Sequence, residues 1–254
     1  MSGTSVGKRI IVLGALSAIG EATARLFAAE GGRLVLAGRN VERLRQVADD
    51  LTARGAAGAQ VWSIDLVSCA DAVGEFARMA SALDGPVDAV LLFFGVLGDQ
   101  AVAERDPAEA ARIINTNFTA AVPWCLAAAA LFERQNAGVL VAVTSVAGDR
   151  GRRSNYVYGA SKAGLTVLVE GIAHRLAGTG ARAVVVKPGF VDTPMTAHLK
   201  RGGPLWAKPD AIARSIKSAV ERAGKPVIYT PWFWRFIMLV VRNVPAFIFH
   251  KTRL

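Results

Sequence analysis

Short apolar runs alternate along the chain with longer stretches in which apolar residues recur at helical spacing. The apolar runs comprise residues 9–13, 33–37, 61–64, 89–95 and 139–143. Such short, mostly apolar segments are typical of parallel strands that are buried on both faces. After the first run, Ala22, Leu26 and Phe27 lie on one face of a helix that starts at Glu21. The alternation predicts an α/β fold, a doubly wound parallel sheet with helices on both faces.

The composition indicates one domain that spans residues 1–254. A chain of 254 residues with 52% hydrophobic content can bury a sizeable core, and no linker, repeat or low-complexity tract divides it. Cys69 and Cys125 lie far apart without metal-ligand spacing, and the three histidines are scattered. We therefore expect a reduced cytosolic protein without a metal site. The residues before the first strand contain no apolar core, so we expect no signal peptide.

A glycine-containing turn joins the first strand to the first helix. Strand, glycine turn and helix, in this order, are the context of a dinucleotide-binding loop, in which free N–H groups at the helix N-terminus face a pyrophosphate. Gly14 permits the tight turn, Gly20 lets the helix pack close to the strand, and Ala18 narrows the approach of the phosphate slightly. The predicted cofactor-binding residues in this loop are Gly14, Ser17, Ala18, Ile19 and Gly20. An ordinary strand-to-helix turn is the alternative.

The residues that follow the second strand favour NADP(H), with NAD(H) as the alternative. Arg39 stands where an acid would bind a ribose 2′-hydroxyl and where an arginine accommodates a 2′-phosphate, and no acid occurs before Glu42. The alternative is that Arg39 stacks on adenine or faces water. Asp65 and Leu66 follow the third strand near the adenine, and Gly95 ends the fourth strand where the nicotinamide ribose should pass.

A second group of residues carries acid–base chemistry. Tyr158 and Lys162 are four residues apart and therefore share one face of a helix. A nearby ammonium favours the phenolate and lowers the pKa of a tyrosine, which then exchanges a proton with a carbonyl or alcohol oxygen. Ser145, after the strand 139–143, is placed to hydrogen-bond the same oxygen. A surface tyrosine beside a solvated lysine is the alternative, against which Ser145 and the phosphate loop argue.

These motifs, in this order, resemble the short-chain dehydrogenase/reductase family across nearly all of the chain. The resemblance rests on Gly14, Ala18, Ile19, Gly20, Asp65, Phe94, Gly95, Asn117, Ser145, Tyr158, Lys162, Pro188 and Gly189. It implies a single Rossmann-like domain with a sheet of about seven strands. It also implies Tyr158 as the acid/base, Lys162 as its activator and ribose ligand, and Ser145 as the substrate anchor.

The resemblance extends to three further positions, and the sequence departs from the family pattern at two places, the first being Ala18, which replaces the middle glycine of the phosphate loop. The resemblance implies that Pro188 and Gly189 contact the cofactor and that Asn117 supports a proton path, for which a helix-bending structural amide is the alternative. Residues 93–96, Phe-Phe-Gly-Val, replace the family's usual Asn-Asn-Ala-Gly. This departure removes a polar stabiliser of the central strand.

Other stretches are similar to one branch of that family. Residues 94–99, 148–159, 195–200 and 236–245 resemble reductases of decaprenylphosphoryl-2-keto-β-D-erythro-pentose, the second half of an epimerase pair in the arabinan pathway of the actinobacterial cell wall. The resemblance implies a polyprenyl-phosphate-linked keto-sugar substrate that is reduced at C2 to an arabinose donor. It also implies a flavin-dependent oxidase partner, which makes the keto sugar, and a homo-oligomer.

The formal net charge of +10 includes a cluster of basic residues near the catalytic residues. We expect no nucleic acid as partner, because no recognition motif or basic-aromatic platform accompanies the charge. Arg150, Arg152 and Arg153 lie in the loop before Tyr158, where arginine can grip a substrate phosphate, and Lys200 follows in a later loop. The alternative is a solvated loop edge.

Residues 231–254 form a basic, aromatic and amphipathic tail. Between Arg222 and Leu254 there are six Lys or Arg and no acid, and Arg235 and Arg242 interrupt the apolar run before it reaches the roughly 20 residues of a spanning helix. Trp and Phe with flanking cations suit the headgroup region of an anionic membrane. We expect a cytoplasmic protein bound peripherally at the inner face of the membrane, or at the periplasmic face if it is exported with a partner. Packing against a neighbouring subunit is the alternative.

Three other functions fit parts of the sequence. A reductase of another lipophilic ketone, of steroid or acyl type, would use the same catalytic residues. A non-catalytic nucleotide-binding protein on this fold has no need of Ser145, Tyr158 and Lys162 together. In a membrane-tethering protein the tail would carry the main function.

Overall fold

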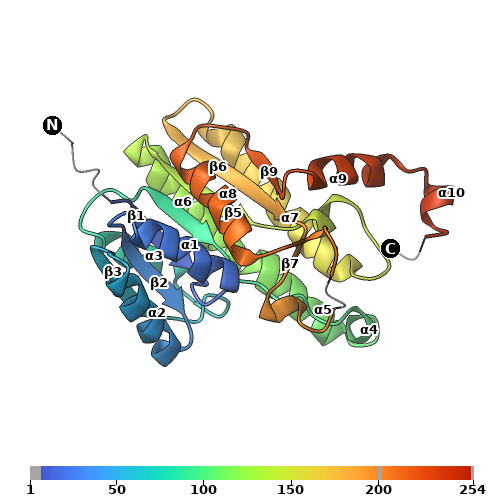
Figure 1. The fold of residues 1–254 in the computed structure, drawn as a ribbon, viewed down its shortest axis with the longest axis horizontal. Coiled ribbons are helices and arrows are strands. Elements are labelled where there is room, and N and C mark those ends of the chain that lie inside the picture. Colours follow the sequence, from blue (N-terminus) through green and yellow to red (C-terminus); the bar gives the residue numbers. More distant parts are fainter. Residues whose placement is uncertain (1–6, 200–201, 253–254) are drawn as a thin grey trace.

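Seven parallel strands form the central sheet of the computed structural model, which describes residues 7–199 and 202–252 (Figure 1). Their order is β3-β2-β1-β4-β5-β6-β9. Their bounds are β1 Arg9–Leu13, β2 Arg33–Gly38, β3 Gly58–Ser63, β4 Ala89–Leu92, β5 Gly138–Val143, β6 Ala181–Pro188 and β9 Val227–Thr230. The chain order reverses between β1 and β4, so a crevice opens beyond the carboxyl ends of these strands. The predicted doubly wound, Rossmann-like α/β fold is confirmed.

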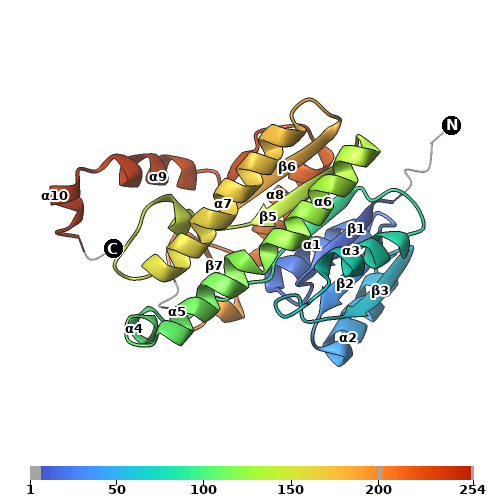
Figure 2. The ribbon, with the colours of Figure 1, turned by 180° about the vertical axis from the view of Figure 1, so that it is seen from behind.

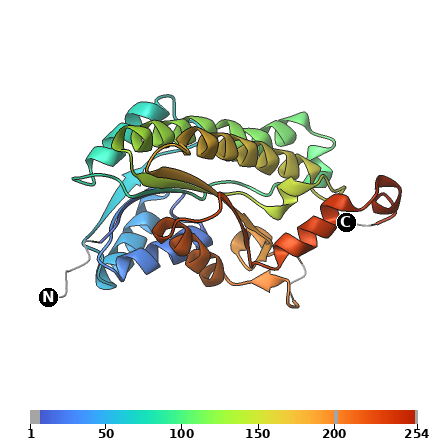
Figure 3. The ribbon, with the colours of Figure 1, turned by 90° about the horizontal axis from the view of Figure 1, so that it is seen from above.

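Two helical layers cover the sheet, as Figures 2 and 3 show from behind and from above. The first layer contains α1 Ala18–Ala28, α2 Val41–Ala53 and α8 Pro209–Glu221, and the second contains α3 Ala72–Ser81, α6 Ala121–Gln135 and α7 Tyr156–Leu176. Each layer buries a separate apolar cluster against its face of the sheet. The five inner strands are mostly buried because both faces are covered, and their sequences are therefore largely apolar, whereas the edge strands β3 and β9 are only partly buried.

Short elements lie at the carboxyl end of the sheet. They are α4 Gln100–Ala103, α5 Pro107–Ile114, the π-helical turn η1 Asn115–Thr119, η2 Val146–Asp149, β7 Phe190–Val191, η3 Pro194–Thr196 and β8 Trp206–Ala207. The continuous helical stretch Pro107–Gln135 is, among the described residues, the one that could cross a bilayer by length and composition. Half of the most apolar part of this stretch is buried inside the protein, because α6 packs in the apolar core.

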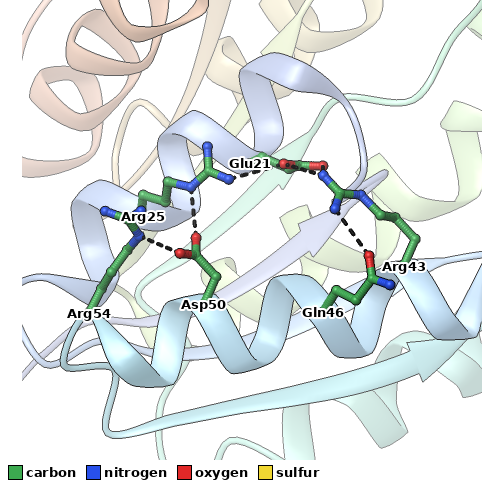
Figure 4. Close-up of polar contacts among 6 residues, drawn as sticks. All are labelled: Glu21, Arg25, Arg43, Gln46, Asp50 and Arg54. Atoms are coloured by element: carbon green, nitrogen blue, oxygen red, sulfur yellow. Dashed lines mark hydrogen bonds and ion pairs between the residues drawn. The ribbon is translucent and has the colours of Figure 1, made fainter.

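A network of ion pairs joins α1 to α2 beside the loops that follow β1 and β2 (Figure 4). Asp50 accepts from Arg25 at 2.8 Å and from Arg54 at 2.9 Å, and these bonds lower its pKa to about 2. Glu21 accepts from Arg43 at 3.1 Å. The side chains are partly exposed, so each pair adds little stability.

The C-terminal segment forms two helices, α9 Trp234–Asn243 and α10 Ala246–Phe249. One face of α9 is buried, because Trp234 and Met238 pack with Val146 of the turn η2 in a third apolar cluster. The opposite face of α9 is apolar but exposed, and it continues into Trp232 before α9 and into α10. The exposed apolar residues of this segment are Trp232, Phe236, Leu239, Val240, Phe247 and Ile248. α9 therefore carries apolar side chains on two faces, one buried against the catalytic end of the sheet and one exposed.

Candidate active site

A cleft of about 660 Å³ lies at the carboxyl ends of the central strands. Most of the predicted cofactor residues line it: Gly14, Ser17, Ala18, Ile19, Arg39, Asp65, Leu66, Gly95, Tyr158, Lys162, Pro188 and Gly189. Gly20 lies one turn inside α1, where an added Cβ would stand 3.1 Å from the Gly14 carbonyl oxygen. The structure therefore brings the residues of the phosphate loop and the acid–base group to one cavity.

The turn after β1 fits a dinucleotide pyrophosphate. Gly14 has φ +84°, and a Cβ there would lie 2.6 Å from the backbone nitrogen of Phe94, so only glycine suits the position. Helix α1 begins at Ala18, earlier than the apolar periodicity predicted, and no side chain caps its first turn. Ala18 and Ile19 line the cleft, so the free N–H groups of this turn are available to an anion.

The adenine end of the cleft carries a cation and a carboxylate. Asp65 accepts from the Val67 N–H at 3.0 Å, and this bond, with a smaller contribution from the charge of Arg39, lowers its pKa. Trp124 donates its indole N–H to the Leu66 carbonyl at 2.9 Å and so ties the loop to the core. Arg39 lies on the cleft wall, and a guanidinium there is suited to bind a phosphate group.

The acid–base group assembles from β5 and α7. Tyr158 and Lys162 lie one turn apart on α7, with the Lys162 ammonium 5.9 Å from the centre of the phenol ring. Ser145 follows β5, accepts from the Ala147 N–H at 3.0 Å, and hydrogen-bonds the Tyr158 phenol. Lys162 is buried and donates to the Val143 carbonyl at 3.3 Å, and its burial lowers its pKa to about 8.

The expected lowering of the Tyr158 pKa is wrong for this structure. Burial raises the pKa of Tyr158 to about 12, and the hydrogen bond from Ser145 offsets only part of that effect. Burial dominates, and the Lys162 ammonium is directed to the Val143 carbonyl. At neutral pH the phenol is therefore protonated, as the donor in a carbonyl reduction must be.

Asn117 lies in the π-helical turn η1 and is completely buried. Its side-chain oxygen accepts from the Val96 N–H at 2.7 Å, while its amide donates to the Val96 carbonyl at 2.8 Å and to the Ser161 hydroxyl at 3.0 Å. A Cβ on Gly95 would meet the Asn117 oxygen at 2.8 Å and the Lys162 ammonium at 3.3 Å. The amide thus supplies a polar support at the end of β4, whose sequence lacks one.

A second cavity, of about 930 Å³, adjoins the cofactor cleft. The two share Ser145, Tyr158, Gly189, Met195 and Thr196, so a substrate in the second cavity would meet the catalytic hydroxyls from the other side. Its outer walls contain both polar and apolar residues, which come from α4, the loop 152–156 and the segment that follows Gly189.

The arginines of the loop before Tyr158 divide between two tasks. Arg152 and Arg153 line the second cavity, and their contact with substrate stays a prediction. The Nε of Arg152 is buried without a hydrogen-bond partner among the described residues, and burial lowers its pKa. Arg150 is directed elsewhere: it donates to the carbonyls of Val241 and, at 2.7 Å, of Val244, so the prediction of a substrate contact is wrong for this residue. Lys200, the fourth predicted contact, lies outside the described residues.

Two buried residues at the site did not emerge from the sequence motifs. Trp234 packs so closely on Gly189 that a Cβ there would lie 1.9 Å from its indole nitrogen. Lys187 is buried at the end of β6 and pairs with Asp149 at 2.6 Å. A lysine within the apolar run of β6 is itself a signal of a buried ion pair, because an unpaired ammonium is costly to bury.

Comparisons with known proteins agree with this geometry. The family profile described as short chain dehydrogenase matches residues 8–203. An uncharacterized oxidoreductase of Mycobacterium tuberculosis is 38% identical over 95% of this chain and 96% of its own length. Another, of Streptomyces coelicolor, is 39% identical over 96% of this chain and 95% of its own.

Solved structures show the same architecture. A metagenomic short-chain oxidoreductase in complex with NADP is 25% identical, with a TM-score of 0.76 that covers 90% of this chain and 98% of that one. Actinorhodin polyketide ketoreductase with NADPH is 22% identical, with a TM-score of 0.80 over 96% of this chain and 100% of that one, and supports the fold alone.

Proposed function

The chain belongs to the short-chain dehydrogenase family, and we propose that it uses NADPH to reduce a keto group on a sugar linked through phosphate to a lipid. Membership makes it an NAD(P)-dependent oxidoreductase. The substrate is our inference from the second cavity, together with the resemblance to reductases of polyprenyl-phosphate-linked keto-pentoses. The named relatives carry no substrate assignment.

The observation that carries the proposal is the buried Nε of Arg152 on the wall of the second cavity, which has no hydrogen-bond partner among the described residues. Another nitrogen of the same guanidinium, Nη2, donates to the Val146 carbonyl at 3.3 Å and so holds the group at the wall. A buried donor without a partner loses solvation, and an anion that binds it restores the lost hydrogen bond. Arginine is suited to phosphate because its planar fork can donate two parallel bonds. The apolar surface of the same cavity accommodates the first part of a lipid chain.

The catalytic residues divide the work of carbonyl reduction. Bound NADPH supplies the hydride at the carbonyl carbon. Tyr158 donates its proton to the carbonyl oxygen, and the pKa of about 12 keeps that proton in place until the oxygen becomes basic. Ser145 donates a hydrogen bond that strengthens as the oxygen gains charge. Lys162 lies beside Gly95, where it can hold the ribose of the cofactor.

NADPH is proposed over NADH because Arg39 stands on the cleft wall after β2. The charge of Arg39 contributes to the lowered pKa of Asp65, so the two side chains lie near each other at this end of the cleft. The metagenomic relative in complex with NADP supports this choice.

The substrate proposal is tested with a matched pair of ketones. A farnesyl-phosphoryl 2-keto-pentose and the same lipid glycoside without phosphate are compared by NADPH oxidation at 340 nm. We expect the phosphorylated compound to have the higher kcat/KM, and Arg152→Gln to remove about 1.5–3 kcal/mol of that preference, roughly 10- to 150-fold. Arg134→Gln, an exposed change on α6, is the control. A preference for the unphosphorylated ketone, or for steroid or acyl ketones, would overturn the substrate class.

Tyr158→Phe tests the reaction class separately. We expect turnover to fall below one thousandth while NADPH affinity is largely kept, because the variant loses the proton donor alone. Substantial remaining activity would refute Tyr158 as the acid.

We also propose that the protein binds an anionic membrane surface through α9 and α10. The exposed apolar face that begins at Trp232 is flanked by Arg235 and Arg242, and residues 222–254 contain no acid. A lipid-linked substrate stays in the bilayer, so an enzyme at its surface meets it there. The keto group must come from an oxidase that acts on a sugar hydroxyl, and we propose a flavin-dependent one as partner.

Vesicle sedimentation tests this surface. We expect binding to vesicles with phosphatidylglycerol, weaker binding to pure phosphatidylcholine, and loss of both in the variant with Trp232→Ser, Phe236→Ser and Leu239→Ser. An unchanged binding curve would refute the proposal. A fall in oligomeric mass in this variant would instead assign the face to a homo-oligomer interface.

A further inference from the structure

A buried carboxylate lies at the junction of three segments near the catalytic serine. Asp149 accepts from the Lys187 ammonium at 2.6 Å through one oxygen and from the Tyr229 hydroxyl at 2.7 Å through the other. The Asp149 and Lys187 side chains are 1% and 7% exposed. Both carboxylate oxygens are therefore satisfied inside the protein, in a geometry that only these partners support.

Asp149 and its two partners belong to three different segments near the active site. Asp149 ends the turn η2, which starts directly after Ser145. Lys187 is the penultimate residue of β6 and precedes Pro188 and Gly189, which line the cofactor cleft. Tyr229 lies on β9, the strand that leads to the C-terminal helices. One carboxylate thus joins the serine turn, the wall of the cleft and the C-terminal segment.

The charges around Asp149 come from every element packed against it. Lys187 faces it from β6, and its ammonium also lies 5.6 Å from the centre of the Tyr229 ring. Arg152, on the same loop, interacts electrostatically with the Asp149 carboxylate, which raises the pKa of Arg152 against the effect of burial. Arg242 of α9 interacts with the Tyr229 hydroxyl on the far side. Lys187 is thus the cation that bonds Asp149 directly, and a neutral side chain at position 149 would lose this ion pair.

We propose that Asp149 is a positioning residue, which fixes the turn η2 so that the Ser145 hydroxyl meets the Tyr158 phenol. The turn is only four residues long, with its first end fixed by β5 and its last end fixed by the Lys187 and Tyr229 contacts. The Ser145 hydroxyl therefore keeps its direction because Asp149 cannot move. The inference rests on the proposed reaction, since it assigns the effect on turnover to Ser145.

The test combines a spectroscopic signal with turnover. The chain contains three tyrosines, Tyr156, Tyr158 and Tyr229, so ¹³Cζ-tyrosine NMR resolves each phenol, with Tyr→Phe variants for assignment. We expect Asp149→Asn to shift the Tyr158 resonance of the cofactor-free protein in the same direction as Ser145→Ala. In the farnesyl-phosphoryl keto-pentose assay, its kcat should fall by roughly 10- to 100-fold with the KM for NADPH unchanged.

The double variant separates positioning from general destabilisation. In the Ser145→Ala background, Asp149→Asn should cause no further shift and no further loss of kcat, because its effect passes through the absent hydroxyl. Additive losses would overturn the proposal, as would a Tyr158 resonance that stays in place. Asp88→Asn is the matched control, since Asp88 accepts from Lys8 and from the Arg9 N–H at the amino ends of β1 and β4, the end of the sheet away from the active site.

Two further comparisons keep the test decisive. If Asp149→Asn does not fold, Tyr229→Phe keeps the ion pair and should give a smaller shift of the Tyr158 resonance in the same direction; no shift would overturn the proposal. If Ser145→Ala and Tyr158→Phe leave turnover intact, the proposed reaction itself fails. If both abolish turnover while Asp149→Asn acts as the Asp88→Asn control does, only the positioning role fails.

Discussion

The contact between Gly189 and Trp234 gives a sharp prediction for Gly189→Ala. A methyl group there would lie 1.9 Å from the indole Nε1, 2.0 Å from Cε2 and 2.6 Å from Cδ1. Carbon atoms in favourable contact are about 3.5–4.0 Å apart, so the ring must move by roughly 1.5 Å or more. Trp234 is 4% exposed and packs with Val146 and Met238, so that movement disrupts the cluster that seats α9.

We expect this overpacking to cost about 1–3 kcal/mol in the free energy of unfolding. For a chain of this size each kcal/mol lowers Tm by about 2–4 °C, so thermal unfolding followed by circular dichroism should show a fall of roughly 2–12 °C. The kcat should fall as well, because Gly189 lines both cavities. The matched control is Gly171→Ala on α7, where a Cβ meets nothing within 4 Å; there we expect a gain of about 0.5–1 kcal/mol.

A second substitution tests the assigned cause. Trp234→Ala removes the ring that the methyl group would meet, so adding Gly189→Ala to it should lower Tm no further. If Gly189→Ala leaves Tm unchanged, or if its cost persists without the indole, the reasoning from this contact is wrong.

The remaining predictions concern protonation, cofactor choice and the end of the chain. Because the pKa of Tyr158 is raised to about 12, kcat/KM for carbonyl reduction should be flat from pH 6 to 8, whereas alcohol oxidation should rise by about tenfold per pH unit; a plateau of the oxidation rate below pH 8 would contradict a raised pKa. Arg39→Asp should lower kcat/KM for NADPH by roughly tenfold or more and leave NADH little affected, as steady-state kinetics with both cofactors would show; equal losses would exclude a 2′-phosphate contact. Removal of residues 245–254 should retain the fold and a Tm within a few degrees, whereas removal of 231–254 also takes Trp234 and Met238 from their cluster and should lower Tm by more than 5 °C, about 2 kcal/mol or more by calorimetry; equal Tm values would refute this packing.

The fold was predictable because strands buried on both faces have continuous apolar sequences. The first and last residues of individual helices and strands were less predictable. Helix α1 begins at Ala18, three residues before the position that periodicity indicated, because its first turn faces the cleft and buries little apolar surface there. Strand β4 ends at Leu92, although Phe93 and Phe94 continue the apolar run, because the backbone there turns toward Gly14.

The catalytic group was predictable from spacing, whereas its electrostatics and the partners of its arginines were not. Helical spacing places Tyr158 and Lys162 on one face, but the pKa of each depends on burial, which spacing does not reveal. Arg150 and Arg152 are two residues apart in one loop, yet the carbonyls that Arg150 binds lie more than 90 residues away in the sequence. Only the tertiary fold decides which of the two faces the cavity.

The way Asn117 holds the end of β4 has a consequence for how this region can diversify. Its amide recognises the main-chain N–H and C=O of Val96, groups that every residue other than proline presents alike. Mutation can therefore alter the side chain at position 96 and leave this attachment intact, as long as the asparagine persists. Substitutions at position 96 can therefore change the shape of the cleft wall that this residue lines, at little cost in the stability of the fold.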